Sequence, residues 1–406
     1  MRNISDRKLK CYTFAGLVCP PLRKYFMNQI LSAQALSNAA QAQFPEGHYG
    51  YEDYQSALEM LLRSLHEEAQ LKPVGLYATS SRLIASLKRR RQLVAHIEKH
   101  PETADIKIER PVFILGFPRT GTTLLHNLFA SDPANRSIRL WEMRDPFAES
   151  EQDIAKAMEE MQALVEAAYR LSPRLVDIHP LKAEWPDECS WLFRNSFASM
   201  VNGFSYFIPS YVQWMLSRDM SEDYEYFRKQ LQTILSLRPG SPLVLKDPCH
   251  IWHLPELLET FPDARIIQLH RDPQQVAPSF ISLCLALQEG AATIRPLPEI
   301  TDYCLNMLTA GLEQMLAARE QLPQEHFIDL GYRELVMNPE AALERLYGGL
   351  AMNFSSQAQT GIRQWLSQGS KHTGKHRYQL SDFGLTAQDV EQQFAAYNQR
   401  FANCLK

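Results

Sequence analysis

The sequence predicts an α/β protein in which a parallel sheet carries helices on its faces. Two observations predict this class. Four short apolar runs are each followed by a turn and then by a helical pattern: "VFIL" (112–115), "PLVLK" (242–246), "ARIIQLH" (264–270) and "HFIDLGY" (326–332). The first run also leads into a loop with two glycines, "GFPRTGTT", which is typical of a phosphate-binding turn between a strand and a helix.

The residues before the first strand, 1–108, predict a helical N-terminal extension. The stretch "YEDYQSALEMLLRSLHEEAQ" places Leu58, Leu61 and Leu65 at helical spacing, without the alternation of a strand. A basic run, Lys88 to Arg91, follows in a second helical pattern. We interpret this run as the solvated face of a helix, because isolated charge runs usually are.

The loop after the first strand predicts an anion site. Gly116 and Gly121 permit backbone conformations and close approaches that other residues resist. The N–H groups that open the next helix point to one place and carry the positive end of the helix dipole. Thr120, Thr122 and Thr123 add hydroxyl donors. The sheet is therefore expected to be P-loop NTPase-like.

This loop differs from the kinase version at one decisive position. An ATP-binding loop has lysine where this chain has Thr122, and the loop contains Arg119 instead. We therefore expect no metal, and a donor whose charge is met by fixed cationic side chains. A P-loop kinase or nucleotide hydrolase, and a nucleotide-binding module without activity, remain the alternatives.

The segment between the first two strands, residues 131–241, predicts a long helical insertion that covers the acceptor side of the site. Its most apolar stretch, residues 196–216, is interrupted by Asn202, Pro209 and Gln213. We therefore expect no integral membrane segment.

Cationic residues end the second and third strands. Lys246 and Arg271 lie where parallel strands present ligand sites, at the carboxyl edge of the sheet. Ser279 lies on the helix after Arg271 and can face the same crevice. Because arginine binds phosphate bidentately, Arg271 is a candidate phosphate ligand. Lys246 and Arg119 are candidates to stabilise charge on a leaving group.

The loop "GFPRTGTTLLHNLFASDP" resembles the 5′-phosphosulfate loop of sulfotransferases that use 3′-phosphoadenosine 5′-phosphosulfate (PAPS). Its arginine form is similar to that of the tyrosylprotein sulfotransferases and of a broad group of bacterial sulfotransferases. "LHRDPQQVAPSF" resembles the 3′-phosphate site of the family, and "GKHRYQLSDFGL" its late loop. The resemblance implies transfer of a sulfuryl group from PAPS to a hydroxyl or amine, leaving 3′-phosphoadenosine 5′-phosphate (PAP). The cofactor-binding residues that it implies are Arg119, Thr120, Gly121, Thr122, Thr123, Arg271, Ser279, Tyr332, Lys375 and Arg377.

Two residues compete for the role of general base. Glu142 follows the loop helix at a place similar to the catalytic glutamate of the tyrosylprotein enzymes, and Trp141 could give it an apolar wall. His250 follows the strand-ending Lys246, and histidine titrates near neutral pH. We rank them about equal, with a slight preference for Glu142.

Other chemically capable residues receive structural interpretations. Asp187 and Glu188 are expected to cap the apolar helix that follows them. His126 is expected to pack in the core, and the role of His179 stays open.

Composition sets the remaining expectations. A net charge of −4 gives no electrostatic case for nucleic-acid binding. Seven cysteines, an odd number without metal-type spacing, favour a reducing, cytoplasmic setting. We expect a sulfotransferase domain over residues 109–390, a C-terminal helical tail over residues 391–406, and a small-molecule or lipid-like acceptor. The oligomeric state and the acceptor's identity are not predicted.

Overall fold

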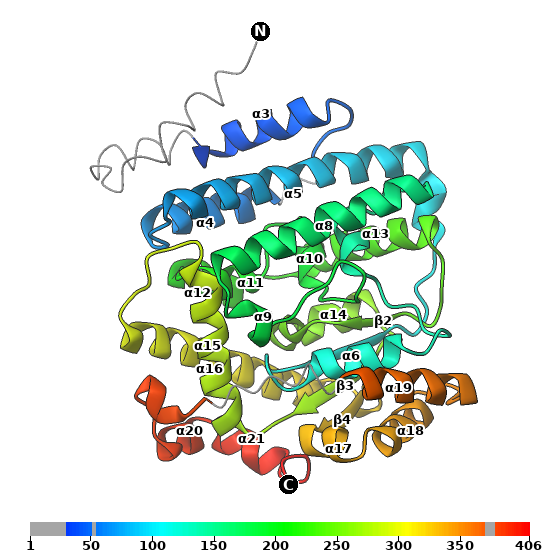
Figure 1. Cartoon of the computed structure of the whole chain (residues 1–406), viewed down its shortest axis with the longest axis vertical. Coiled ribbons are helices and arrows are strands. Elements are labelled where there is room, and N and C mark those ends of the chain that lie inside the picture. Colours follow the sequence, from blue (N-terminus) through cyan, green and yellow to red (C-terminus); the bar gives the residue numbers. More distant parts are fainter. Residues whose placement is uncertain (1–29, 51–53, 370–377) are drawn as a thin grey trace.

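The computed structural model describes residues 30–50, 54–369 and 378–406. Its centre is a sheet of four strands in the order β2-β1-β3-β4 (Figure 1). The strands are β1 (Val112–Gly116), β2 (Val244–Lys246), β3 (Arg265–His270) and β4 (Phe327–Gly331). All three neighbouring pairs are parallel. The predicted P-loop NTPase-like fold is confirmed, and the carboxyl ends of the strands share one edge.

The sheet is buried on both faces. On β1, Phe113 and Leu115 join an apolar cluster with helices from the insertion and from the segment after β3. Val112 and Ile114 point the other way, into a second cluster with the helix that follows the loop and helices near the C-terminus. Because successive strand residues face opposite sides, a sheet covered on both faces has continuously apolar strands, which is the pattern that the sequence showed.

Helices make up most of the rest of the described chain. Before β1 they are α3 (Ala33–Gln43), α4 (Tyr54–Glu67), α5 (Pro73–Lys99) and the 3₁₀ turn η2 (Pro101–Asp105). Between β1 and β2 they are α6 (Thr122–Ala130), α7 (Leu140–Arg144), α8 (Glu151–Leu171), α9 (Leu175–Ile178), α10 (Ser190–Phe193), α11 (Val201–Ser205), α12 (Pro209–Ser217) and α13 (Ser221–Leu237). After β2 they are η3 (Pro248–Trp252), α14 (Leu254–Thr260), α15 (Pro273–Glu289), α16 (Leu297–Gln321), η4 (Gln324–His326), α17 (Tyr332–Met337), α18 (Pro339–Gly349), α19 (Ser356–Gly369), η5 (Leu380–Phe383), α20 (Ala387–Gln393) and α21 (Ala395–Arg400).

The second half of the basic run on α5 is buried and the first half is partly exposed, so its interpretation as a solvated face was wrong. Arg90 and Arg91 are 2% and 4% exposed. The Arg90 side chain donates to the backbone oxygens of Tyr49 and Asn195 and lies between two tyrosine rings. A guanidinium group offers five donors and a flat face, so carbonyl oxygens and aromatic rings can bind it in a protein interior.

The insertion between β1 and β2 is helical, as predicted, and lies between the α4–α5 layer and the sheet (Figure 1). Its most apolar stretch is broken into the short helices α11 and α12. Within the described residues, every helix is too short or too polar to cross a membrane.

The end of the chain differs from the expected division at residue 390. Helix α20 spans that boundary, running from Ala387 to Gln393, and α21 follows after one residue. Both helices pack against the main body, with Val390, Phe394 and Tyr397 in its largest core cluster. The tail is therefore continuous with the domain that carries the sheet.

Candidate active site

The loop between β1 and α6 is held in an unusual backbone conformation. Arg119 and Gly121 have φ angles of 76° and 99°. A Cβ atom at Gly121 would lie 2.7 Å from the ring of Tyr332, so both the conformation and the space require glycine. Arg119 has no such freedom, and a non-glycine residue in this region costs about 1–3 kcal/mol. This backbone conformation determines the direction of the Arg119 side chain.

Two cationic side chains and a hydroxyl group meet beside this loop. Arg119 donates from Nε to Oγ of Ser279 at 3.0 Å and from Nη1 to the backbone oxygen of Ile178 at 2.7 Å. Arg271 donates from Nη1 to the backbone oxygen of Arg119 at 2.9 Å, and its guanidinium carbon lies 4.2 Å from the ring centre of Tyr332. Burial, with the nearby charge of Arg271, lowers the pKa of Arg119. Two cations held by neutral groups make a place where an anion is stabilised.

Thr120 does not share this role. Both its hydroxyl and its N–H donate to the backbone oxygen of Phe117, at 2.8 and 3.2 Å, and its side chain is fully buried. Its donors are thus used inside the loop, and its prediction as a phosphate ligand is not supported. Thr122 and Thr123 are the first residues of α6. The backbone N–H groups in the first turn of a helix have no hydrogen-bond partner within the helix.

A second cluster surrounds Lys246, at the end of β2. Its Nζ atom lies 2.9 Å from Oε1 of Glu188, 3.8 Å from Oδ1 of Asp187 and 3.4 Å from Oγ1 of Thr123. Burial alone would lower the pKa of Lys246, but the two carboxylates outweigh it and raise the pKa. Lys246 is therefore a buried ammonium group beside the first turn of α6.

Asp187 and Glu188 do not cap the next helix, so that expectation was wrong. An Asp187 oxygen accepts instead from the N–H of Glu188 at 2.7 Å. Burial would raise the pKa of Glu188, but Lys246 and His179 reverse the effect and lower it. Glu188 is thus ionised near neutral pH and paired with the strand-ending lysine.

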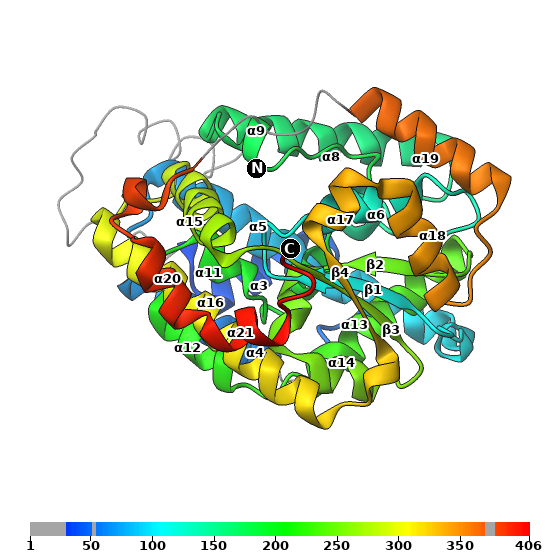
Figure 2. The ribbon, with the colours of Figure 1, turned by 90° about the horizontal axis from the view of Figure 1, so that it is seen from below.

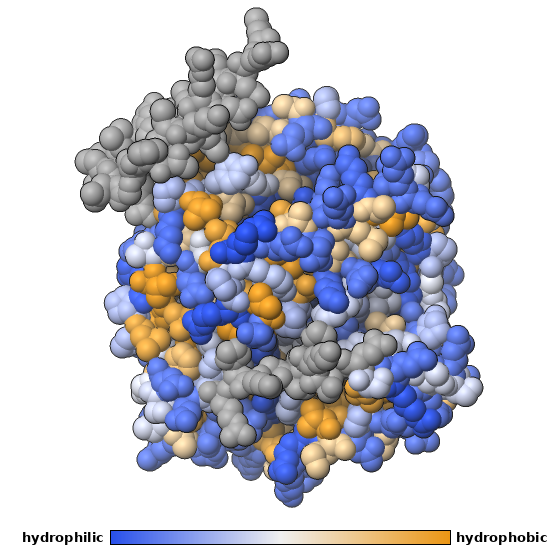
Figure 3. All heavy atoms as spheres, viewed as in Figure 1, coloured by the Kyte–Doolittle hydropathy of each residue, from blue (hydrophilic) through white to orange (hydrophobic). Residues whose placement is uncertain are grey.

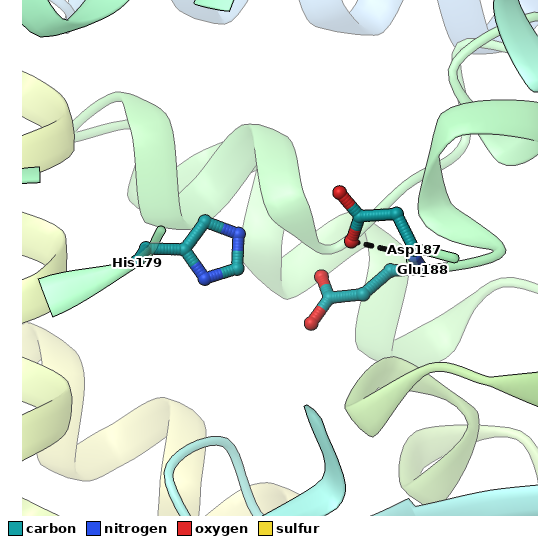
Figure 4. Close-up of side chains that lie close together, drawn as sticks. All are labelled: His179, Asp187 and Glu188. Atoms are coloured by element: carbon teal, nitrogen blue, oxygen red, sulfur yellow. Dashed lines mark hydrogen bonds between the residues drawn. The ribbon is translucent and has the colours of Figure 1, made fainter. Parts of the chain in front are cut away.

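His179, at the end of α9, completes this cluster. Its ring points toward the carboxylates of Asp187 and Glu188 (Figure 4), and one ligand atom from each of the three residues lies within 4.8 Å of the others. Burial lowers the pKa of His179, and the two carboxylates offset part of that effect. The spacing would suit a metal ion, but the Lys246 ammonium group already occupies Glu188. The geometry instead favours a neutral imidazole that can accept a proton.

Glu142, the preferred base from the sequence, is engaged elsewhere. It is 2% exposed, and its two carboxylate oxygens accept from Arg136 at 2.6 and 3.1 Å and from the N–H of Arg139 at 2.8 Å. Arg136 pairs through its backbone with residues just before β2 and at its start, Pro242 and Val244. The carboxylate thus lies toward the amino edge of the sheet, and it is held as an ion pair.

His250 is also placed away from the site. It is 1% exposed and packs among Phe113, Phe193 and Phe227. Its Nδ1 atom lies 2.7 Å from the hydroxyl of Tyr224. Burial lowers its pKa to about 3. A histidine enclosed by aromatic rings has no route to an acceptor, so the geometry argues against His250 as well.

The remaining residues that the sequence analysis singled out lie in three different settings. His126 is buried beneath the site and hydrogen-bonded to the backbone oxygen of Val244, in agreement with a packing role. Tyr332 covers the loop from β4. Lys375 and Arg377 lie outside the described residues.

A sequence profile of the sulfotransferase family matches residues 111–356, more than half of the chain and all of the segment from β1 to the start of α19. The chain belongs to the sulfotransferase family. This assignment decides against the kinase and hydrolase alternatives and in favour of sulfuryl transfer to an acceptor.

Relatives of this sulfotransferase include the omega-hydroxy-beta-dihydromenaquinone-9 sulfotransferase Stf3 of Mycobacterium bovis. It is 26% identical over 288 residues, which cover 67% of this chain and 70% of Stf3. Among solved structures, STF1 of Mycobacterium tuberculosis matches with a TM-score of 0.80 and 27% identity, over 91% of this chain and all of that one. STF9 of Mycobacterium avium matches with a TM-score of 0.82 and 26% identity, over 91% and 97% of the two chains.

Proposed function

We propose that this sulfotransferase takes its sulfuryl group from PAPS and binds the donor between the β1–α6 loop and the end of β3. The supporting observation is the joining of two anion-binding groups in one cluster. The loop offers the first N–H groups of α6, and Arg271 reaches the same loop through the backbone oxygen of Arg119. PAPS carries its phosphosulfate and 3′-phosphate on one nucleotide and matches this pair of sites.

Arg119 and Lys246 then have defined tasks. Transfer of a sulfuryl group breaks its bond to the donor's bridging oxygen, which gains negative charge as it leaves with PAP. Thr123, at the start of α6, is within 3.4 Å of the Lys246 ammonium group. A buried cation at this point stabilises the leaving oxygen more than it would in water. Arg119, held by Ser279 and by the backbone of α9, gives a second fixed charge.

We further propose that His179 is the general base. The acceptor hydroxyl loses its proton to the imidazole as its oxygen bonds to sulfur, and the resulting imidazolium faces Glu188 and Asp187 (Figure 4). A lowered pKa keeps His179 neutral and able to accept a proton near pH 7. Glu188 stabilises the charge that His179 gains and keeps Lys246 in place.

The acceptor is proposed to be a lipid-like alcohol or phenol. Val176 and Leu171, on the segment that leads to His179, are 48% and 39% exposed, although both are large and apolar. Ile294, on the connection from α15 to α16, and Leu297, the first residue of α16, are exposed as well. Figure 3 shows apolar surface gathered over this connection. Leu171 packs on Gly290 at the end of α15, which brings the two apolar segments together.

The test of the base is His179→Ala, assayed with labelled PAPS, EDTA and a prenylated hydroquinone as acceptor. We expect kcat to fall about 10²–10⁴-fold, because a positioned general base contributes that much, while the Kd for PAP stays within about twofold. The loss should shrink with a nitrophenol, whose hydroxyl is already acidic. His48→Ala is the matched control, since His48 is an exposed histidine paired with Glu98.

Two results would count against these assignments. A His179→Ala enzyme with nearly full kcat would move the role of base to Glu188. Transfer that stopped with EDTA and returned with Mg²⁺ would contradict a site built on fixed side-chain cations.

A further inference from the structure

Residues of the last two helices and beside them pack against the β1–α6 loop and the strand ends that form the proposed donor site. Phe394 and Tyr397 pack edge-on against Phe117 in the β1–α6 loop, with ring centres 6.1 and 5.5 Å apart. Phe401 stacks on His270 at the end of β3, at 4.0 Å. Figure 2 shows α20 and α21 running beside α16 toward the strand ends. The C-terminus thus touches the loop and the end of β3 at once.

The contact reaches the end of β4 as well. A Cβ atom at Gly331, the residue before Tyr332, would lie 2.3 Å from the backbone oxygen of Cys404. Only glycine allows the chain to pass so close to that strand end. One segment of fewer than twenty residues therefore fixes the ends of β1, β3 and β4 relative to one another.

Tyr397 makes the most specific of these contacts. Its hydroxyl lies 3.1 Å from Nδ1 of His270, the residue immediately before Arg271. The other ring nitrogen of His270, Nε2, lies 2.9 Å from Asp329, which Arg319 holds in turn. A buried network thus fixes the ring of His270, the residue next to Arg271 in the chain.

The network acts on the chain next to Arg271, whereas other contacts hold the Arg271 side chain. Its guanidinium group bonds to the backbone of Arg119 and to the side chain of Gln275, and it lies over Tyr332. Tyr332 itself packs on Gly121. A backbone that moved by a fraction of an ångström would turn a bidentate phosphate contact into a poor one, because such contacts depend on angle.

We propose that Tyr397 is a positioning residue for the donor, which acts through Arg271 to set affinity for the 3′-phosphate. The inference rests on the proposed donor site and goes beyond it, because it assigns the C-terminal helix to that site. Tyr397 is 1% exposed and does not touch the donor's place itself.

The experiment compares PAP with adenosine 5′-phosphosulfate, which lacks the 3′-phosphate. In Tyr397→Phe the ring stays and only the hydroxyl is lost. We expect the Kd for PAP to rise about 3–10-fold, within the range given by one lost hydrogen bond between uncharged groups, and the Kd for adenosine 5′-phosphosulfate to change less than about twofold. Isothermal titration measures both. A purely structural role would weaken the two ligands equally and so leave their ratio unchanged.

Tyr347→Phe is the matched control. Tyr347 is an equally buried tyrosine whose hydroxyl bonds to Asp132 and Asn135 in the other core cluster. Loss of the Tyr347 hydroxyl should lower stability and leave the ratio of the two Kd values unchanged. Should Tyr397→Phe fail to fold, Phe401→Leu removes the ring stacked on His270 and tests the same ratio.

Arg271→Ala separates the inference from the proposed function. If that variant loses its preference for PAP while Tyr397→Phe and Phe401→Leu keep theirs, the donor site is right and the positioning role is wrong. If Arg271→Ala itself keeps the preference, the proposed 3′-phosphate site fails, and the inference fails with it.

Discussion

Replacement of His250 tests its contributions to stability and to catalysis by separate measurements. In the double variant Tyr224→Phe/His250→Phe the buried imidazole becomes a phenyl ring among aromatic neighbours, and the tyrosine hydroxyl that it contacts is removed as well. The reference is the single variant Tyr224→Phe, which differs only at residue 250. Any change in how stability depends on pH then belongs to the histidine.

The magnitude follows from the pKa values. The pKa of His250 falls from 6.5 to about 3 on folding because of burial, with a smaller contribution from His253. As pH drops below 6.5 the unfolded chain takes up the proton first, so stability is lost on acidification down to about pH 3. At about pH 5 the free energy of unfolding has fallen by ~2 kcal/mol. This loss depends little on the native pKa of His250, because a pH of about 5 lies well above that pKa. His126, whose pKa is also about 3, is present in both variants and cancels.

The assay is urea unfolding at about pH 7.5 and pH 5. The double variant should lose ~2 kcal/mol less than its reference between these conditions. Equal losses in the two proteins would show that His250 is not a buried neutral histidine. Transfer at about pH 7.5 should have a similar kcat in both. If the double variant alone lost about 10²-fold in kcat with PAP binding intact, His250 would be the base after all.

Two further predictions concern the loop and the other rejected base. Gly121→Ala should destabilise the fold by about 1–3 kcal/mol and abolish detectable PAP binding, because φ is 99° and the new Cβ meets Tyr332; thermal unfolding and titration check this, and unchanged PAP affinity would contradict the loop geometry. Glu142→Gln should cost about 1–3 kcal/mol in urea unfolding, because a neutral amide replaces the buried carboxylate that accepts from Arg136. Its kcat per folded molecule should stay close to that of the unchanged enzyme, and a large kcat loss would restore Glu142 as a catalytic candidate.

The strands and the anion loop could be predicted because their causes are local. A buried parallel strand is apolar throughout, and the turn after it needs glycine, so β1 to β4 and the start of α6 were visible in the sequence. The approach of Arg271 to the loop was also predictable, because both lie at the carboxyl edge that all parallel strands share.

The proposed proton-transfer group could not be predicted, because its arrangement depends on contacts between residues far apart in the chain. Glu188 meets Lys246 across 58 residues, and a backbone bond from Cys189 to Lys246 fixes that approach. In the sequence, a pair of acids before an apolar run looked like a helix cap. The one available signal was the strand-ending lysine, since a buried cation requires an anion and neither Glu142 nor His250 provides it.

The buried arginines of α5 have a consequence for shortened versions of this enzyme. The segment matched by the family begins at residue 111 and leaves α5 out. Arg89 and Arg90 nevertheless bind the side chain and the backbone of Asn195, seven residues after Glu188 in the same run of the insertion. A chain trimmed to the matched segment would strip Asn195 of two donors and expose the apolar face that α4 and α5 cover. The matched segment is therefore not a complete unit of folding, because the helical extension shares one apolar core with the sheet.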